Sequence, residues 1–140
     1  MTPKEECEVL LDPLLNAAES LLKKNGEFYP IGAVMRSDGE IVFTAVMEQN
    51  DHPDSDTVIA SLTELHKVQA EQNEIKASGI AWDAVIQNAA GERQDAIMVS
   101  MEHKDAYTVV VGKPYKKGLF KKIVFGQIFA QHGKNDIWKS

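Results

Sequence analysis

Cysteine is nearly absent from this 140-residue sequence, in which Cys7 is the single one. One cysteine cannot form a disulfide within the chain, which is consistent with a reducing compartment. Long apolar runs are missing too, since no stretch approaches the roughly 18 to 20 residues that span a bilayer. The first residues, MTPKEECEV, are acidic where a secretory signal has a basic and then an apolar region. These absences predict a cytoplasmic protein with no membrane partner.

The sequence also lacks the motifs that mark common enzyme classes. It contains no Gly-x-Ser-x-Gly elbow, no Walker loop and no dinucleotide-binding glycine fingerprint. Gly32 and Gly126 are isolated glycines in apolar stretches, which a bulge or close packing against a helix explains. We therefore expect no cofactor, and the sequence offers no positive support for catalysis.

Positive charge is scarce in the first part of the chain and concentrated in the last. The net charge is −6, but residues 113–140 carry seven lysines against the single carboxylate of Asp136. That part is therefore +6 and residues 1–112 are −12. Such segregation produces opposed surface potentials that can steer a charged partner. The competing explanation is that lysines on an exposed edge strand discourage aggregation.

The first element predicted is an amphipathic helix from Pro3 to Lys24. Its apolar positions recur at helical spacing, as in Leu11, Leu15, Ala18 and Leu22. Asp12 is a good N-cap and Pro13 suits the first helical position, so we expect the main helix to begin at Pro13 after a shorter or kinked extension. Asn25 and Gly26 should end it.

Two strands and a second helix are predicted next. Phe28–Arg36 and Glu40–Glu48 read as a hairpin around Ser37-Asp38-Gly39. A polar loop then leads into a helix from about Ser55 to Lys76, which Ser78 and Gly79 should end.

The rest of the chain predicts three or four further strands. These are Ile80–Gln87, Gln94–His103, Tyr107–Val111 and Lys121–Gln131, with Pro114–Gly118 as a basic connection. The segment Gln94–His103 is nearly as apolar on one strand face as on the other, which indicates a central strand with Ile97 and Val99 buried. We predict a single α+β domain in the order α-β-β-α-β-β-β. Its antiparallel sheet would have about five or six strands, with two main helices mostly on one face.

Glu102 and His103 are the most tempting candidates for chemistry. Adjacent strand residues point to opposite faces, so the pair cannot act on one substrate. Asp95 shares a face with His103 but lies roughly 26 Å away at ~3.3 Å per residue. A catalytic site would need a partner from another segment, and the alternative we keep is a site containing Asp83 and His103.

A second candidate is the acidic loop before the second helix, with the metal-ligating residues Asp51, His52, Asp54 and Asp56. These could collect a divalent cation, but the loop lacks the glycine and the later bidentate glutamate of a calcium hand. Helix capping by Asp54 or Ser55 explains most of its composition. His66, within the second helix, is more typical of a packed or boundary residue than of a ligand.

The strongest binding signal is the basic run KPYKKGLFKK. Its candidate residues are Lys113, Tyr115, Lys116, Lys117, Lys121 and Lys122. Cations beside aromatic rings suit single-stranded nucleic acid, but the −12 of the remaining chain would repel the same polyanion. Opposed charge patches suit association with a protein better, and a homodimer is one form of it.

Three blocks of sequence carry a resemblance. They are residues 28–34 (FYPIGAV) with 38–40 (DGE), residues 95–97 (DAI) with 102–103 (EH), and residues 114–115 (PY) with 125–126 (FG). Together they resemble a group of small, uncharacterised bacterial proteins of similar length. The resemblance implies a stand-alone bacterial cytoplasmic domain and carries no activity.

These observations favour a non-catalytic protein-binding module, of the kind that serves as an immunity or regulatory factor. The acidic residues of the first 112 positions would then face a basic target. The alternative is a small hydrolase or metal-dependent enzyme that uses Asp83, His103 or the acidic loop.

Overall fold

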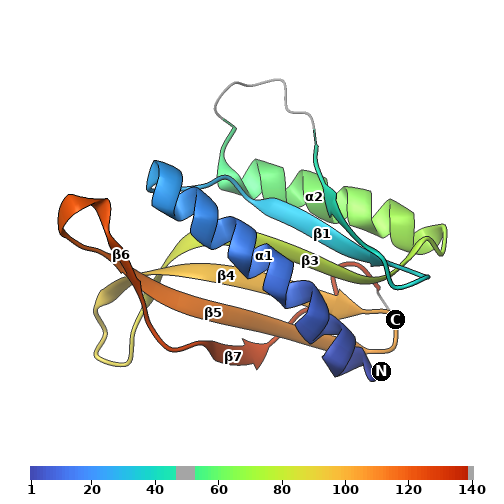
Figure 1. The fold of residues 1–140 in the computed structure, drawn as a ribbon. Coiled ribbons are helices and arrows are strands. Elements are labelled where there is room, and N and C mark those ends of the chain that lie inside the picture. The colour runs from blue at the N-terminus through green and yellow to red at the C-terminus, as the bar shows by residue number, and fades with distance from the viewer. Residues whose placement is uncertain (47–52, 139–140) are drawn as a thin grey trace.

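The computed structural model of the chain describes residues 1–46 and 53–138. One antiparallel sheet dominates it (Figure 1). Its neighbouring strands are, in order, β2 (Ile41–Thr44), β1 (Ile31–Arg36), β3 (Ile75–Gln87), β4 (Arg93–His103) and β5 (Tyr107–Lys117). Two short strands, β6 (Ile123–Phe125) and β7 (Phe129–His132), both pair with the outer edge of β5. The α+β class is confirmed, with seven strands where five or six were expected.

The sheet separates two helices, α1 (Pro3–Asn25) and α2 (Ser55–Glu71). A Cβ placed on Gly79 of β3 would lie 2.5 Å from Leu14 of α1, whereas the neighbouring Ser78 bonds to His66 of α2. Because successive strand residues point to opposite faces, the helices cover opposite faces of the sheet (Figure 1). The expectation that both cover mostly one face is wrong. Because strand β4 is apolar on both of its faces, each face of the sheet must be covered by a separate element.

Helix α1 is continuous, which corrects the predicted start at Pro13. Thr2 and Glu5 form a reciprocal capping box at its beginning, and Gly26 ends it in the left-handed conformation. Pro13 removes only the hydrogen bond to the carbonyl of Val9. Val9 lies on the exposed side of the helix, where a water molecule can donate a hydrogen bond to its carbonyl instead.

Helix α2 ends at Glu71, five residues before the predicted end at Lys76. Asn73, with a φ of 58°, turns the chain, and β3 begins at Ile75. Ser78 and Gly79 therefore lie inside a strand and do not end a helix. Pairing of β3 with both β1 and β4 overrides the helical pattern of this polar segment.

The C-terminal strands also differ from the prediction. Strand β5 continues through Pro114 to Lys117, where a basic connection was expected. The carbonyl of Pro114 accepts a hydrogen bond from Gly126 at 2.8 Å, so its backbone faces the outer edge of the strand. Because proline has no N–H group to donate, the row of hydrogen bonds along the outer edge of β5 is interrupted at Pro114. The single strand expected over Lys121–Gln131 is consequently split into β6 and β7.

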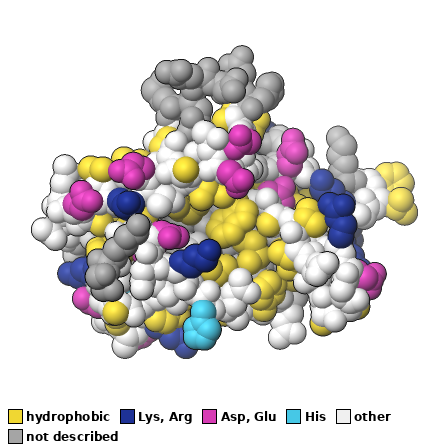
Figure 2. Space-filling model, turned by 180° about the vertical axis from the view of Figure 1, so that it is seen from behind, with side chains coloured by type: hydrophobic (Ala, Val, Ile, Leu, Met, Phe, Trp, Pro, Cys, Tyr) yellow, Lys and Arg dark blue, Asp and Glu magenta, His cyan; other side chains and the backbone are white. Residues whose placement is uncertain are grey.

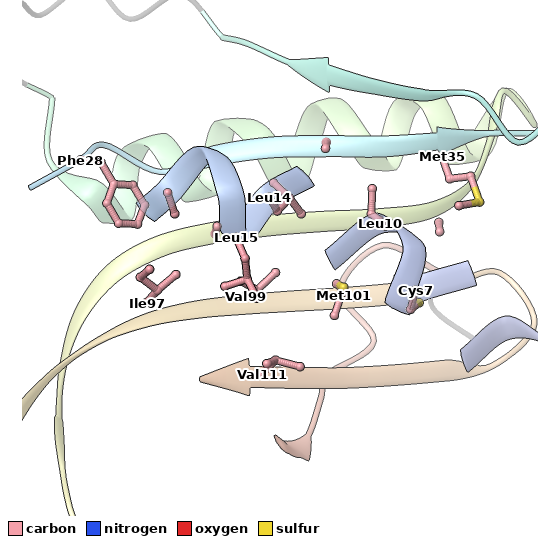
Figure 3. Close-up of a cluster of buried hydrophobic side chains, with 14 of the residues drawn as sticks. Cys7, Leu10, Leu14, Leu15, Phe28, Met35, Ile97, Val99, Met101 and Val111 are labelled. Carbon is pink, nitrogen blue, oxygen red and sulfur yellow. The ribbon is translucent and has the colours of Figure 1, made fainter. Parts of the chain in front are cut away.

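The main core lies between α1 and the sheet (Figure 3). Leu10 and Leu14 pack toward Ile97 and Val99, and all four side chains are fully buried. The prediction that β4 is central, with Ile97 and Val99 buried, is confirmed. Cys7 belongs to the same core, where burial raises the pKa of its thiol to about 12 and suppresses its reactivity.

The opposite face is covered less completely. Helix α2 packs over β3 through Val58, Leu62 and Ile80. Beyond it lies a hollow of about 320 Å³ whose floor includes Trp82 and Met98. Figure 2 shows hydrophobic side chains exposed in the middle of this face. No helix in the described part of the chain is long and apolar enough to cross a membrane.

Candidate functional site

Glu102 is almost fully buried on the α2 face of the sheet. Its carboxylate accepts hydrogen bonds from the backbone N–H groups of Asp136 and Ile137, each at 3.0 Å, and of Trp138 at 3.4 Å. Burial raises the pKa of Glu102, and these three donors oppose the rise. The carboxylate therefore anchors residues 136–138 across the sheet and has a structural role.

His103 faces α1, so Glu102 and His103 do point to opposite faces, as predicted. The Asp105 N–H donates to His103 Nδ1 at 3.1 Å, which places the proton of the neutral ring on Nε2. That Nε2–H donates to Glu6 at 3.0 Å, and Lys76 contacts the other oxygen of Glu6 at 2.5 Å. The hydrogen bond from Lys76 lowers the pKa of Glu6. This network joins α1 to the sheet.

Asp83 accepts a hydrogen bond from the hydroxyl of Tyr115 at 2.5 Å. Burial raises the pKa of both groups. Asp83 lies opposite Ile97, and His103 lies opposite Ala77, six residues further along β3. At ~3.3 Å per residue this separation is about 20 Å. The alternative site containing Asp83 and His103 is therefore wrong, because the sheet register keeps them apart.

His66 lies at the centre of a chain of hydrogen-bonded side chains. From the sequence, His66 was predicted only to be a packed or boundary residue. Its Nδ1 lies 2.7 Å from Ser78 Oγ, and its Nε2 lies 2.8 Å from Thr44 Oγ1. Helix α2 is thus tied to β3 and β2. The ring is fully buried, and burial lowers its pKa to about 4. The spacing from Leu62 to His66 placed the ring on the buried face, but nothing indicated its two hydroxyl partners.

The burial of His66 predicts a loss of stability in acid. Its pKa falls from about 6.5 in the unfolded chain to about 4 in the folded one, so the unfolded state binds more protons between these values. We expect stability to fall as pH is lowered through this window, by about 2 kcal/mol from this group at pH 5. Urea unfolding at pH 7 and pH 5 measures it. In His66→Gln, the part of the decrease in stability between pH 7 and pH 5 that is due to His66 should disappear. An unchanged pH dependence in that variant would show that His66 is not its cause.

The acidic loop is described only in part. Asp51 and His52 lie outside the described residues. Asp54 caps α2 by accepting the Thr57 N–H at 2.8 Å, which lowers the pKa of Asp54, and Asp56 is exposed. Within residues 1–46 and 53–138, no three potential ligands are placed to hold a metal ion. Capping by Asp54 is confirmed.

The structure sorts the basic run into two groups. Lys113 pairs with Glu19 at 2.9 Å and lies 5.0 Å from the ring centre of Phe125, while Tyr115 is buried. These two residues are already engaged within the molecule. The exposed members are Lys116, Lys117 and Lys122, for which the described chain provides no ion pair. The side chain of Lys121 lies outside the described set.

A protruding apolar tip connects β5 to β6. The tip contains η1 (Leu119–Lys121) and is closed by a hydrogen bond from the Gly118 N–H to the Lys122 carbonyl. Leu119 is 84% exposed and Phe120 is 99% exposed. Phe120 also has a φ of 59°, a left-handed conformation that costs a bulky residue roughly 1–2 kcal/mol. The fold therefore holds a phenylalanine in water in an unfavourable backbone conformation.

Two lysines from the other end of the sequence lie beside the base of the hairpin that carries this tip. Lys23 and Lys24, at the end of α1, line a small hollow of about 170 Å³ together with Lys117. We call this surface the basic end and define it by Lys23, Lys24, Lys116, Lys117, Leu119, Phe120 and Lys122. Figure 2 shows dark blue and yellow side chains together at this end of the molecule. No local signal in the sequence links the two lysine groups.

Chemically, the basic end offers unpaired ammonium groups beside exposed apolar side chains. That combination can bind an anionic, partly apolar surface. The chain was compared with protein-family models, with curated proteins and with solved structures, and no match was found in any of the three.

Proposed function

We propose that the protein is a non-catalytic module that binds another protein through its basic end. The observation that carries the proposal is the full exposure of Phe120, held in a strained conformation in a chain segment that also carries the exposed Lys116, Lys117 and Lys122. Interface hot spots are typically large side chains that become desolvated on binding. Strain that persists in a fold is concentrated at functional segments. Recognition of a partner accounts for both features.

The polar groups that suggested catalysis support the same proposal. Glu102 anchors the C-terminal segment, His103 bonds to Glu6, and Asp83 bonds to Tyr115. Each of these side chains therefore has a structural partner. A small cytoplasmic binding module of bacterial origin, acting as an immunity or regulatory factor, remains the role we propose. A toxin gene next to this gene would favour immunity.

The binding proposal predicts that the tip is essential for partner capture. We expect the tagged protein to recover a partner at moderate salt, and the double variant Leu119→Ser/Phe120→Ser to lose at least about 30-fold in affinity, as hot-spot residues do. Val68→Ser is the matched control, since Val68 is an exposed apolar residue on α2. Recovery that is equal for both variants, or no recovery by the wild type, would count against the proposal.

The alternative, a metal-dependent enzyme, would be stabilised by its metal ion. Because we propose a binding module, we expect no rise in melting temperature with Mg²⁺, Ca²⁺, Mn²⁺ or Zn²⁺. A specifically bound ion stabilises the folded state by mass action, so thermal shift detects it. A rise that disappears in Asp54→Asn/Asp56→Asn would establish a metal site in the acidic loop. The same rise in that variant would place the ion elsewhere.

A further inference from the structure

We infer that the hollow in the basic end binds a carboxylate from an acidic segment of the partner protein, while the apolar tip contacts a hydrophobic residue beside it. This inference rests on the proposed function and adds the chemistry of the partner. It is carried by the convergence of α1 and the β5–β6 hairpin around a concave, cation-lined surface. Figure 1 shows the end of α1 close to that hairpin.

Three contacts bring the two segments together. The hollow has Leu22 and Ile123 among its apolar lining residues and the side chains of Lys23, Lys24 and Lys117 around them. Lys23 Nζ lies 5.8 Å from the ring centre of Phe125 in β6. A Cβ placed on Gly26 would lie 3.9 Å from Lys117 Nζ. The ammonium groups of an N-terminal helix and a C-terminal hairpin therefore share one opening.

The charge balance of the hollow favours an anion. The carbonyl end of α1 contributes about −0.5 of an elementary charge, and Glu27 is the nearby exposed carboxylate. Three lysines outweigh these charges and that of Asp83, with which Lys117 interacts electrostatically, and no described carboxylate lies within ion-pair distance of the three ammonium groups. A bound carboxylate would supply the missing partner.

The neighbouring tip determines which anion fits. Leu119 follows Lys117 by two residues, so the apolar tip begins within about 7 Å of the cation-lined hollow. A ligand that satisfies both must carry a carboxylate and an apolar side chain a few residues apart. A polyanion without apolar groups fits less well, because it leaves Leu119 and Phe120 exposed to water. The ligand that fits this surface is therefore an acidic peptide segment that contains an apolar residue.

The test uses defined polymers in place of the unknown partner. Binding of the full chain to a glutamate–tyrosine copolymer and to polyglutamate would be measured by fluorescence anisotropy at two salt concentrations. We expect tighter binding to the copolymer, and about a tenfold loss of affinity in Lys23→Gln/Lys24→Gln/Lys117→Gln. Leu119→Ser/Phe120→Ser should remove the preference for the copolymer while leaving polyglutamate binding unchanged.

The matched control is Lys4→Gln/Lys104→Gln/Lys134→Gln, which removes the same charge from exposed lysines elsewhere. An equal loss in this control would overturn the inference, since it would show only a net-charge effect. Tighter binding to phosphatidylserine vesicles or to a thymidine oligonucleotide would also overturn it and assign the surface to lipid or nucleic acid. If no polymer binds but capture of the natural partner still requires the tip, the inference fails and the proposed function stands.

Discussion

Replacing Leu14 by alanine is expected to lower the free energy of unfolding by about 3 to 5 kcal/mol. Leu14 is fully buried between α1 and the sheet, and its methyl group covers Gly79 of β3. The truncation removes apolar contacts and leaves a cavity that the rigid sheet cannot fill. Chemical denaturation monitored by circular dichroism measures the change.

Two comparisons separate this packing effect from a general effect on α1. Val9→Ala on the same helix should cost less than about 1 kcal/mol, because Val9 is 40% exposed. A Cβ on Gly79 would lie 2.5 Å from Leu14, so Gly79→Ala should be destabilising alone but less so when combined with Leu14→Ala. Strict additivity of the two changes would contradict the contact.

Replacing Glu102 by glutamine is expected to cost about 2 to 3 kcal/mol and to release the C-terminal segment. One acceptor oxygen would become an NH₂ donor facing the backbone N–H groups of residues 136–138, which would leave buried donors unpaired. Denaturation measures the stability. Hydrogen exchange of the three amides measures the release, because protection requires the carboxylate.

The exposed Glu92→Gln is the matched control for this change and should have an effect within about 0.5 kcal/mol. If the amides of residues 136–138 stay protected in Glu102→Gln, the segment is held by the packing of Ile137 against Val34 and Ala70, and the anchoring role of Glu102 is wrong.

Much of the architecture could be predicted from local patterns. The double-sided apolar character of Gln94–His103 predicted the central strand β4, and alternation predicted that Glu102 and His103 face opposite ways; both are confirmed. The end of the second helix was predicted wrongly because QNEIK fits a helical pattern. The buried pairing of Ile75 and Ala77 with neighbouring strands decides otherwise.

The candidate site was predictable only as a run of charge. The sequence marks Lys113 and Tyr115 as equal members of the basic run, but partners in α1 and β3 already engage both side chains. Lys23 and Lys24 could not be assigned to the same surface, because about ninety residues separate them from Lys117. Side-chain partners at this distance depend on the sheet register, which local patterns do not contain.

By itself, the sequence determined the α+β class, the amphipathic character of both helices and the positive charge of the last part of the chain. These properties depend on neighbours a few residues apart, which periodicity and composition report directly. Only the tertiary structure decided which face each helix covers, which polar groups are already paired, and which lysines from distant segments share the hollow at the basic end. Those outcomes depend on contacts between residues far apart in the chain, whose pairing follows from packing of the whole domain.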